Sequence, residues 1–112
     1  MRLLYIAGPY RGESIWETVQ NIRRAEMVAL EYWRKGYAVI CPHKNTALFD
    51  GAEGTTDDTW LEGDLEILGR CDVVVALPGW KGSMGARAEV VEARRQGIPV
   101  WEYPMEMVRD GE

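Results

Sequence analysis

The sequence predicts an α/β fold in which a mostly parallel β-sheet carries helices on both faces. Short apolar runs of strand-forming residues alternate with longer segments of helical period, and the runs close at glycine or proline turn signals. Strands that alternate with helices of this length are joined by right-handed crossovers in parallel sheets. With 112 residues, the chain is expected to form a single domain over residues 1–112.

Composition excludes several classes of protein. Hydrophobic residues make up 46% of the chain and charged residues 28%, which is ordinary for a soluble globular protein. No apolar segment approaches the ~18 residues of a membrane span. The net charge of −5 argues against a nucleic-acid polymer, since binding one needs basic surface. A small anionic ligand held by backbone amides remains compatible with this charge.

The cysteines and the single histidine indicate neither disulfides nor a metal. Cys41 and Cys71 lack CxxC spacing and a histidine cluster, so we expect reduced core thiols in a cytoplasmic protein. The chain enters a strand at once, so no signal peptide is expected. His43, without a second histidine or a nearby cysteine pair, does not form a metal site. We expect no metal and no organic cofactor.

The first half of the chain predicts two strands around a long helix. Residues 2–7 form a buried strand that stops at a Gly-Pro turn, and residues 8–14 form a polar loop. Ser14 and Glu17 have capping-box spacing, so a helix starts there and ends at Gly36. The residues expected on its core face are Ile15, Val19, Ile22, Met27, Leu30 and Trp33.

A long loop and a second helix follow the next strand. Residues 37–41 predict a short buried strand closed by a proline. Residues 43–58 contain four acidic residues and no apolar period, so we expect an irregular loop of functional importance. Residues 59–69 predict a helix with Asp64 on its polar side. Trp60, like Trp33, is expected in the core.

The stretch from residue 71 to residue 104 organises the rest of the fold. It predicts a strand over residues 72–77, a glycine-rich loop, a helix opening near Ser83 and a strand over residues 98–101. Residues 103–112 are too few for another strand and helix. The expected sheet has four or five strands in the order 2-1-3-4 and is flavodoxin-like or Rossmann-like. That order places the loops after strands one and three together, where such sheets bind ligands.

The loop after the third strand, GWKGSMG, suits an anion. It has three glycines, a lysine and Ser83 at a helix start, where backbone N–H groups converge. It lacks the spacing of a Walker A motif. The loop alone equally permits an interpretation in which Ser83 only caps the helix. Arg11 and Gly12 in the neighbouring loop favour an anion site, and Trp80 is placed to stack on a base or on a partner.

Glu89 is the carboxylate that the predicted core does not need. It lies about 60° from the apolar stripe of its helix, at the border between core and cleft, where partial desolvation makes a carboxylate reactive. The alternative is an exposed glutamate that balances nearby arginines. Asp64 has a similar alternative as an ordinary polar-face residue. Tyr5 is a mid-strand residue with its hydroxyl at the rim, and His43 is expected to face the ligand cleft.

These motifs together resemble the nucleoside 2-deoxyribosyltransferase superfamily. The matching segments are YIAGPYRG at residues 5–12, Asp64-Leu followed by CDVVV at residues 71–75, and Ser83-Met-Gly85 followed by Glu89. They are collinear and extend to residue 100. The resemblance implies a single domain of this superfamily over the whole chain. It also implies a homodimer or a higher homo-oligomer.

The resemblance implies a role for each matching residue. Glu89 falls on the nucleophile that attacks the anomeric carbon, Asp64 on the residue that assists the departing base, and Tyr5 on the tyrosine that orients the glutamate. Ser83 and Arg11-Gly12 match the branch of 2'-deoxynucleoside 5'-phosphate N-hydrolases. The substrate-binding residues implied are Gly8, Arg11, Gly12, His43, Ser83 and Gly85. The implied activity is hydrolysis or transfer at the N-glycosidic bond of a (deoxy)nucleoside 5'-monophosphate through a glycosyl-glutamate intermediate.

Alternative functions remain open at this point. The chain departs from the hydrolase branch at Arg87, where that branch has glycine, and at Ala88, which replaces an aromatic residue. The alternatives are a nucleoside 2-deoxyribosyltransferase that acts on unphosphorylated nucleosides and a catalytically inactive nucleotide-binding or sensing module. A third is a bare scaffold or oligomerisation domain, which would have no affinity for nucleotides.

Overall fold

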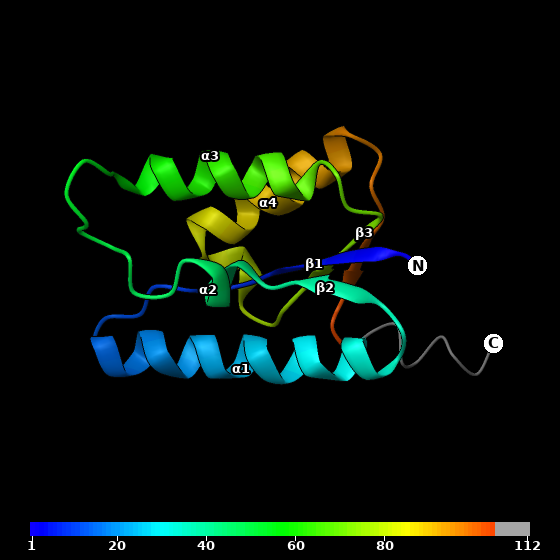
Figure 1. Cartoon of the computed structure of the whole chain (residues 1–112), viewed down its shortest axis with the longest axis horizontal. Helices are drawn as coiled ribbons and strands as arrows, with labels where there is room; N and C mark the ends of the chain where they lie inside the picture. Colours follow the sequence, from blue (N-terminus) through cyan, green and yellow to red (C-terminus); the bar gives the residue numbers. More distant parts are fainter. Residues whose placement is uncertain (105–112) are drawn as a thin grey trace.

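The computed structural model describes residues 1–104 and shows a parallel sheet between two helical layers (Figure 1). The strand order is β2-β1-β3-β4, which confirms the predicted topology. Residues 105–112, most of the predicted tail, lie outside the described residues. The strands are β1 (Leu3–Ala7), β2 (Ala38–Ile40), β3 (Val73–Ala76) and β4 (Val100–Glu102).

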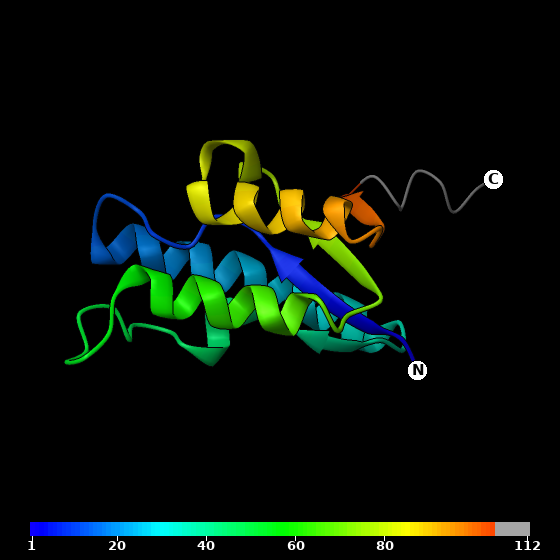
Figure 2. The same cartoon turned by 90° about the horizontal axis from the view of Figure 1, so that it is seen from above.

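The helices divide between the two faces of the sheet. Figures 1 and 2 show α1 (Ile15–Arg34) along one face, and α3 (Asp57–Leu68) and α4 (Met84–Arg95) side by side over the other. Two short helices complete the fold, α2 (Pro42–Asn45) and the 3-10 turn η1 (Trp80–Gly82). This is the three-layer arrangement that the sequence predicts.

The register of β1 decides which of its side chains reach which layer. Tyr5 lies opposite Ile40 of β2 and Val74 of β3. Because side chains alternate along a strand, Leu4 and Ile6 pack with α1, whereas Tyr5 packs in the layer of α3 and α4. Tyr5 therefore points to the same side of the sheet as the residues of α4.

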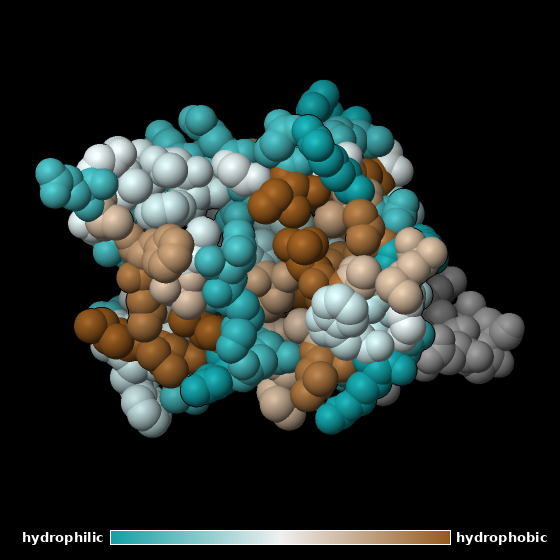
Figure 3. All heavy atoms as spheres, in the orientation of Figure 1, coloured by the Kyte–Doolittle hydropathy of each residue, from teal (hydrophilic) through white to brown (hydrophobic). Residues whose placement is uncertain are grey.

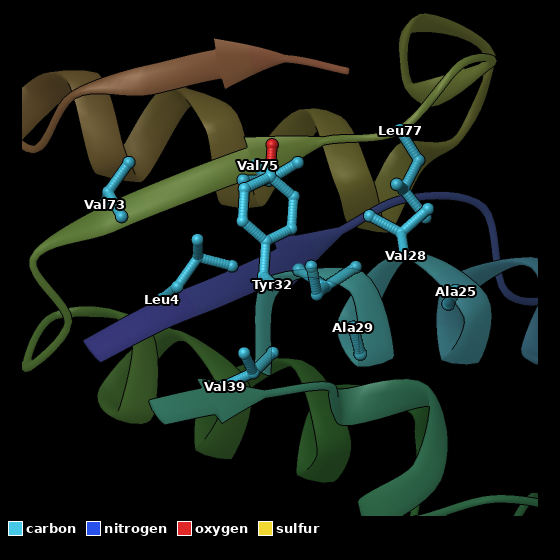
Figure 4. Close-up of a cluster of buried hydrophobic side chains, with 10 residues drawn as sticks. Leu4, Ala25, Val28, Ala29, Tyr32, Val39, Val73, Val75 and Leu77 are labelled. Carbon is cyan, nitrogen blue, oxygen red and sulfur yellow. The ribbon is translucent and has the colours of Figure 1, made fainter. Parts of the chain in front are cut away.

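The main core lies between the sheet and α1. Figure 4 shows valine and leucine side chains of the strands converging on small residues and Tyr32 of the helix. Leu4, Val73 and Val75 have no exposed surface, and burying each such side chain contributes about 1.5–3 kcal/mol. The small helix residues in this contact, Ala25 and Ala29, let α1 approach the sheet closely.

The predicted core face of α1 is confirmed at Ile22 and wrong at four of its six residues. Trp33 is 52% exposed and Ile15 is 76% exposed, and Met27 and Leu30 are exposed as well. The buried residues of the helix are Thr18, Ile22, Ala25, Val28, Ala29 and Tyr32. Ala25 and Ala29 bring the helix close to the sheet, and the face that carries them, with Val28 and Tyr32, is the one that packs. The predicted ends of the helix are confirmed. Ser14 caps its start, and Gly36, just beyond its last turn, has a positive φ.

The segment predicted as one irregular loop contains ordered structure at both ends. Residues 42–45 form α2, which starts with Pro42 at a position that favours proline. Helix α3 begins at Asp57, earlier than predicted, because Thr56 and Thr59 form a capping box. Trp60 is only half-buried and packs edge-on against Phe49, with 5.7 Å between ring centroids.

Two further expectations near β4 need correction. The strand begins at Val100, two residues later than predicted. Trp80 is buried, and its indole N–H donates to the carboxylate of Glu102 at 3.2 Å. Its ring is therefore part of the fold and is not available to stack on a base or on a partner.

An apolar hollow lies beside the edge strand β2. It has a volume of about 760 Å³ and is bordered by Leu30 and Trp33 of α1, Val39 and Ile40 of β2, and Ile67 of α3. Figure 3 shows hydrophobic side chains gathered on this face between α1 and α3. In residues 1–104, no helix combines the length and the apolar character that crossing a membrane requires.

Candidate active site

Glu89 lies inside the molecule, not on its surface. Ser83 caps α4 by accepting a hydrogen bond from the backbone N–H of Ala86 at 3.2 Å. Ala86 and Val90 fix the helix against the sheet, and Glu89 between them is only 7% exposed. The alternative of an exposed glutamate that balances arginines is therefore wrong.

The structure brings Tyr5 and Glu89 together. The Tyr5 hydroxyl, in the middle of β1, donates a hydrogen bond to Oε2 of Glu89. Tyr5 has no exposed surface, and burial together with the nearby charge of Glu89 raises its pKa, so the phenol stays protonated. The bond joins residues 84 positions apart in the sequence. The neutral phenol is the donor, and the carboxyl oxygen of Glu89 is the acceptor.

Asp64 completes a group of three side chains. It lies on α3, which packs against α4, and is half-buried. Burial raises the pKa of Asp64 to about 6. Its negative charge in turn raises the pKa of both Glu89 and Tyr5, which shows that the three groups interact electrostatically.

The pKa of Glu89 is raised to about 8. The main cause is desolvation, and Asp64 adds to the shift while the hydrogen bond from Tyr5 opposes it. Two interacting carboxyl groups with raised pKa values can hold one proton at neutral pH. Such a pair can supply both a nucleophile and an acid.

The predicted phosphate-binding arginine is engaged by the protein itself. Arg11 donates to both carboxylate oxygens of Asp57 at 2.9 Å and to Asp50 at 2.9 Å. Tyr10 donates to Asp50 at 2.9 Å and accepts from the backbone N–H of Leu48 at 2.7 Å. We call Tyr10, Arg11, Asp50 and Asp57 the Arg11 clasp.

The clasp keeps its carboxylates ionised. Hydrogen bonds from Arg11 lower the pKa of Asp57. Partial burial opposes the same effect at Asp50, but hydrogen bonds from Arg11 and Tyr10 still hold the pKa of that carboxyl below its usual value. The clasp therefore carries two negative charges around one positive charge.

The glycines of the loop after β1 serve close packing. A Cβ on Gly12 would lie 2.3 Å from Cβ of Glu17, and one on Gly8 would lie 2.8 Å from Cβ of Leu77. The Gly12 N–H donates to Oγ1 of Thr18 at 2.9 Å, and the next N–H, of Glu13, donates to Oε1 of Glu17 at 3.0 Å. Side chains of α1 thus satisfy the amides that the sequence offers to an anion.

His43 lies beneath this loop and not in an open cleft. It is 5% exposed, and its Nε2 lies 3.0 Å from the carbonyl oxygen of Pro9 and 3.2 Å from that of Gly8. Nε2–H donates to these acceptors, and burial lowers the pKa of the imidazole, which favours the neutral form. His43 therefore fastens the end of β1 to α2. Among residues 1–104, no three His, Cys, Asp or Glu side chains gather in a way that suits a metal ion.

The start of α4 is the part of the predicted anion site that stays open. The N–H groups of Met84 and Gly85 donate to no acceptor in the described part of the chain, and no atom lies within 4 Å of a Cβ built on Gly85. Arg87 is exposed on the next turn and Ala88 is half-buried. The Ser83 hydroxyl oxygen accepts the capping hydrogen bond from Ala86, and the side chain is half-buried beside these amides.

Sequence reasoning missed Asp50, Asp57 and Tyr10. The acidic content of the segment was visible, but its pairing with Arg11 depends on how a loop folds back over β1. One signal was available: Asp57 and Asp64 are seven residues apart, a spacing that puts both on the same face of a helix.

Comparisons with known proteins place the fold. The family described as "Domain of unknown function (DUF7768)" matches residues 2–103, and no curated protein matches. A 2-deoxyribosyltransferase from Bacillus psychrosaccharolyticus is 21% identical with a TM-score of 0.62, covering 89% of this chain and 70% of that one. A conserved protein from Enterococcus faecalis V583 is 25% identical with a TM-score of 0.61, covering 91% and 62%.

A third similar structure, a 2-desoxiribosyltransferase from Leishmania mexicana, is 17% identical with a TM-score of 0.65. The match covers 92% of this chain and 64% of the Leishmania chain. The chain therefore spans between 62% and 70% of the length of these three structures. At these identities, the likeness establishes a shared α/β fold.

Proposed function

This chain belongs to the DUF7768 family, and we propose that it cleaves the N-glycosidic bond of a nucleoside or nucleotide with Glu89 as the nucleophile. The observation that carries the proposal is the buried Glu89 held by the Tyr5 hydroxyl, with Asp64 in electrostatic range. The fold shared with two 2-deoxyribosyltransferases supports the same reaction class.

In the first step, the ionised carboxylate of Glu89 attacks C1' of the sugar. The C1'–N bond breaks, and its electron pair leaves with the base. Asp64, in its protonated form, gives its proton to the departing base. The product is a glycosyl ester on Glu89, and a retaining reaction of this kind needs the two carboxyl groups about 5 Å apart. The Tyr5 hydroxyl holds the attacking carboxylate in one orientation.

The second step decides between hydrolysis and transfer. The carboxylate of Asp64 takes a proton from a water or from a second base, which then attacks C1' and releases Glu89. Attack by water yields the free sugar, and attack by a base yields a new nucleoside. Both outcomes use the same residues in the same roles, so the proposal covers either one.

The proton inventory of the pair fits this cycle. With pKa values of about 8 for Glu89 and about 6 for Asp64, the pair holds one proton between those limits. The reactive form of the pair carries that proton on Asp64 and leaves Glu89 ionised. Because Glu89 has the higher pKa, this form is a minor fraction of the singly protonated pair, and the fraction stays constant across this pH range. Activity is therefore expected to be highest near pH 7.

Two substrate classes compete. A (deoxy)nucleoside 5'-monophosphate is supported by the open amides of Met84 and Gly85 beside Ser83. In the neighbouring loop, which Gly8 and His43 shape, Arg11 and Gly12 would first have to give up their bonds to Asp50, Asp57 and Thr18. An unphosphorylated nucleoside is supported by the pairing of Arg11 with two aspartates.

A nucleotide-binding module without catalysis is a further candidate, motivated by Arg87 and Ala88 beside the nucleophile. Calorimetric titration with nucleosides and nucleotides, followed by chromatography of the mixture, separates the two. Tight binding with an intact ligand indicates a binding module, whereas free base indicates an enzyme.

The proposed assembly is a homodimer or a higher homo-oligomer. The apolar hollow beside β2, with Leu30 and Trp33 exposed on its border, supports a second copy of the chain as the occupant. Light scattering during gel filtration tests this: an oligomer is expected for the native sequence, and Trp33→Lys should shift it toward the monomer. A monomeric native protein would contradict the assembly.

The test of the reaction is Glu89→Ala with base release as the readout. Common deoxynucleosides and their 5'-monophosphates serve as substrates, and chromatography measures the free base. We expect a loss of at least about a thousandfold. Glu92→Gln, one turn further along α4 and paired with Arg95 at the surface, is the matched control. Unchanged turnover by a folded Glu89→Ala variant would rule out the assignment.

A further inference from the structure

We propose that Asp50 and Asp57 set the substrate class of this site: by occupying Arg11 they make it prefer unphosphorylated nucleosides over nucleoside 5'-monophosphates. The inference rests on the proposed function and names its substrate class. It starts from the Arg11 clasp, which the reaction itself does not use.

Asp50 and Asp57 offer Arg11 the same kind of anionic oxygen acceptors that a phosphate would offer. Asp57 accepts from both terminal nitrogens of the guanidinium, each at 2.9 Å, and Asp50 accepts a further bond from one of them. Paired N–H donation to two oxygens of one anion is also how arginine binds phosphate. An incoming 5'-phosphate must therefore displace these carboxylates to reach Arg11.

Charge strengthens this competition. Two carboxylates around one guanidinium leave the clasp with a net charge of −1 when all three are ionised. A phosphate monoester brings about −1.5 to −2 at pH 7 and would be repelled by any displaced aspartate that stays nearby. The N–H groups of Gly12 and Glu13 in the same loop cannot compensate, since they already donate to Thr18 and Glu17.

The clasp is close enough to the reacting groups to affect the substrate. Asp57 and Asp64 lie seven residues apart on α3, which places them on one face about 10 Å apart along the helix axis. Arg11 follows the strand that carries Tyr5. Figures 1 and 2 both show the loop after β1 and the segment before α3 at the same end of the molecule.

The clasp is also tied down from outside. The Tyr10 hydroxyl bonds Asp50 and the backbone of Leu48, and Phe49 packs against Trp60 of α3. These contacts hold Asp50 and its loop in place, and Asp57 is fixed at the start of α3. Freeing Arg11 therefore costs more than breaking an isolated surface ion pair. Arg11 is thus held in place by contacts within the protein.

The experiment compares two double variants that remove the same charge. Asp50→Asn with Asp57→Asn keeps side-chain size but frees Arg11. The control, Glu53→Gln with Asp58→Asn, changes neighbouring exposed carboxylates that make no contact with Arg11. For each protein, kcat/KM for base release is measured on deoxynucleosides and on their 5'-monophosphates, with circular dichroism as the check on folding.

We expect the native protein to favour the deoxynucleoside. In the Asp50/Asp57 variant, the ratio of kcat/KM for monophosphate over nucleoside should rise at least about tenfold. It should change less than about twofold in the control, and Arg11→Ala added to the first variant should reverse the gain. Calorimetry in a Glu89→Gln background should show the same effect on binding. The Asp50/Asp57 variant should bind the monophosphates with a lower Kd than the native sequence or the control.

The other possible outcomes overturn either the specificity inference alone or the proposed function together with it. Base release from nucleosides with the same ratio in both double variants overturns the specificity inference and leaves the proposed function standing. A native protein that prefers monophosphates overturns the inference as well. If no variant releases base from, or binds, any of these compounds, the proposed function fails and the inference fails with it.

Discussion

Two pairs of carboxylates on the same side of the sheet have opposite electrostatics. Glu89 is buried and Asp64 half-buried, and their pKa values are raised to about 8 and about 6. Asp50 and Asp57 surround Arg11 near the surface, and their pKa values are lowered. Helix α3 contributes one member to each pair.

The difference separates chemistry from recognition. A carboxyl group that titrates near neutral pH can exchange a proton during a reaction, so the first pair suits catalysis. A carboxylate that stays ionised acts as a fixed charge, so the second pair suits discrimination between charged and neutral substrates.

Asp64→Asn should reduce base release by about a hundredfold, because an amide cannot protonate the departing base. Chromatographic assays of kcat measure the loss, and Asp58→Asn on the exposed first turn of α3 is the control. Substrates whose base leaves without protonation should lose less than others. An equal loss on every substrate would argue against Asp64 as the acid.

Tyr5→Phe should lower kcat by about tenfold, since the variant keeps the ring but loses the hydrogen bond that orients Glu89. That bond also lowers the pKa of Glu89, so the upper limb of the pH profile should move to higher pH. Tyr37→Phe, in a ring cluster outside the site, is the control. A drop in rate with an unmoved profile would indicate a purely structural role.

The pH profile of kcat/KM should be bell-shaped, with limbs near pH 6 and pH 8. Below the first value both carboxyl groups of the catalytic pair hold protons and Glu89 cannot attack; above the second neither holds one and the base leaves unprotonated. Rates measured from pH 5 to pH 9 test this. A flat profile would show that this pair does not control the reaction.

Stability should respond to pH with opposite sign in the two pairs. Folding raises the pKa of Glu89 from about 4.3 to about 8, so the folded state binds the extra proton and loses stability as pH rises through that range. Glu89→Gln should therefore be more stable than the native protein at pH 9, by up to about 5 kcal/mol, with little difference at pH 4.

Asp57 should behave in the opposite way. Its folded pKa is lowered, so its contribution is present above an unfolded pKa of about 3.9 and is lost as pH falls below it. Asp57→Asn should therefore reduce stability at pH 7 and not at pH 3. Urea unfolding of both variants across pH tests the contrast, and shifts of the same sign in both would contradict it.

The sequence was sufficient for the topology, because strand order follows from alternating elements and crossover rules. Residue pattern alone left ordinary interpretations open for Tyr5, Asp64 and Glu89, and only the resemblance to the nucleoside 2-deoxyribosyltransferase superfamily grouped them. Their roles stay predictions, but their meeting in space is a direct consequence of β1 lying beside β3 and beneath α4.

The rest depended on packing that a pattern does not encode. The helical period of α1 could be read from the sequence. Which side of the helix faces the sheet depends on how closely the alanines let the helix approach. The environment of Arg11 depends on a loop that folds back from α2 to α3, and such a loop has no periodicity to read. Burial of Trp80 likewise follows from its bond to Glu102, a partner 22 residues away.

The most direct test of the account is to trap the glycosyl ester. The native protein is mixed with a deoxynucleoside, quenched in acid within the first turnover, digested and analysed by mass spectrometry. We expect a deoxyribosyl mass on the peptide that contains Glu89, and no such mass on that peptide in Glu89→Gln. Base release at the native rate with the adduct on another residue, or with the Glu89→Gln protein fully active, would contradict it.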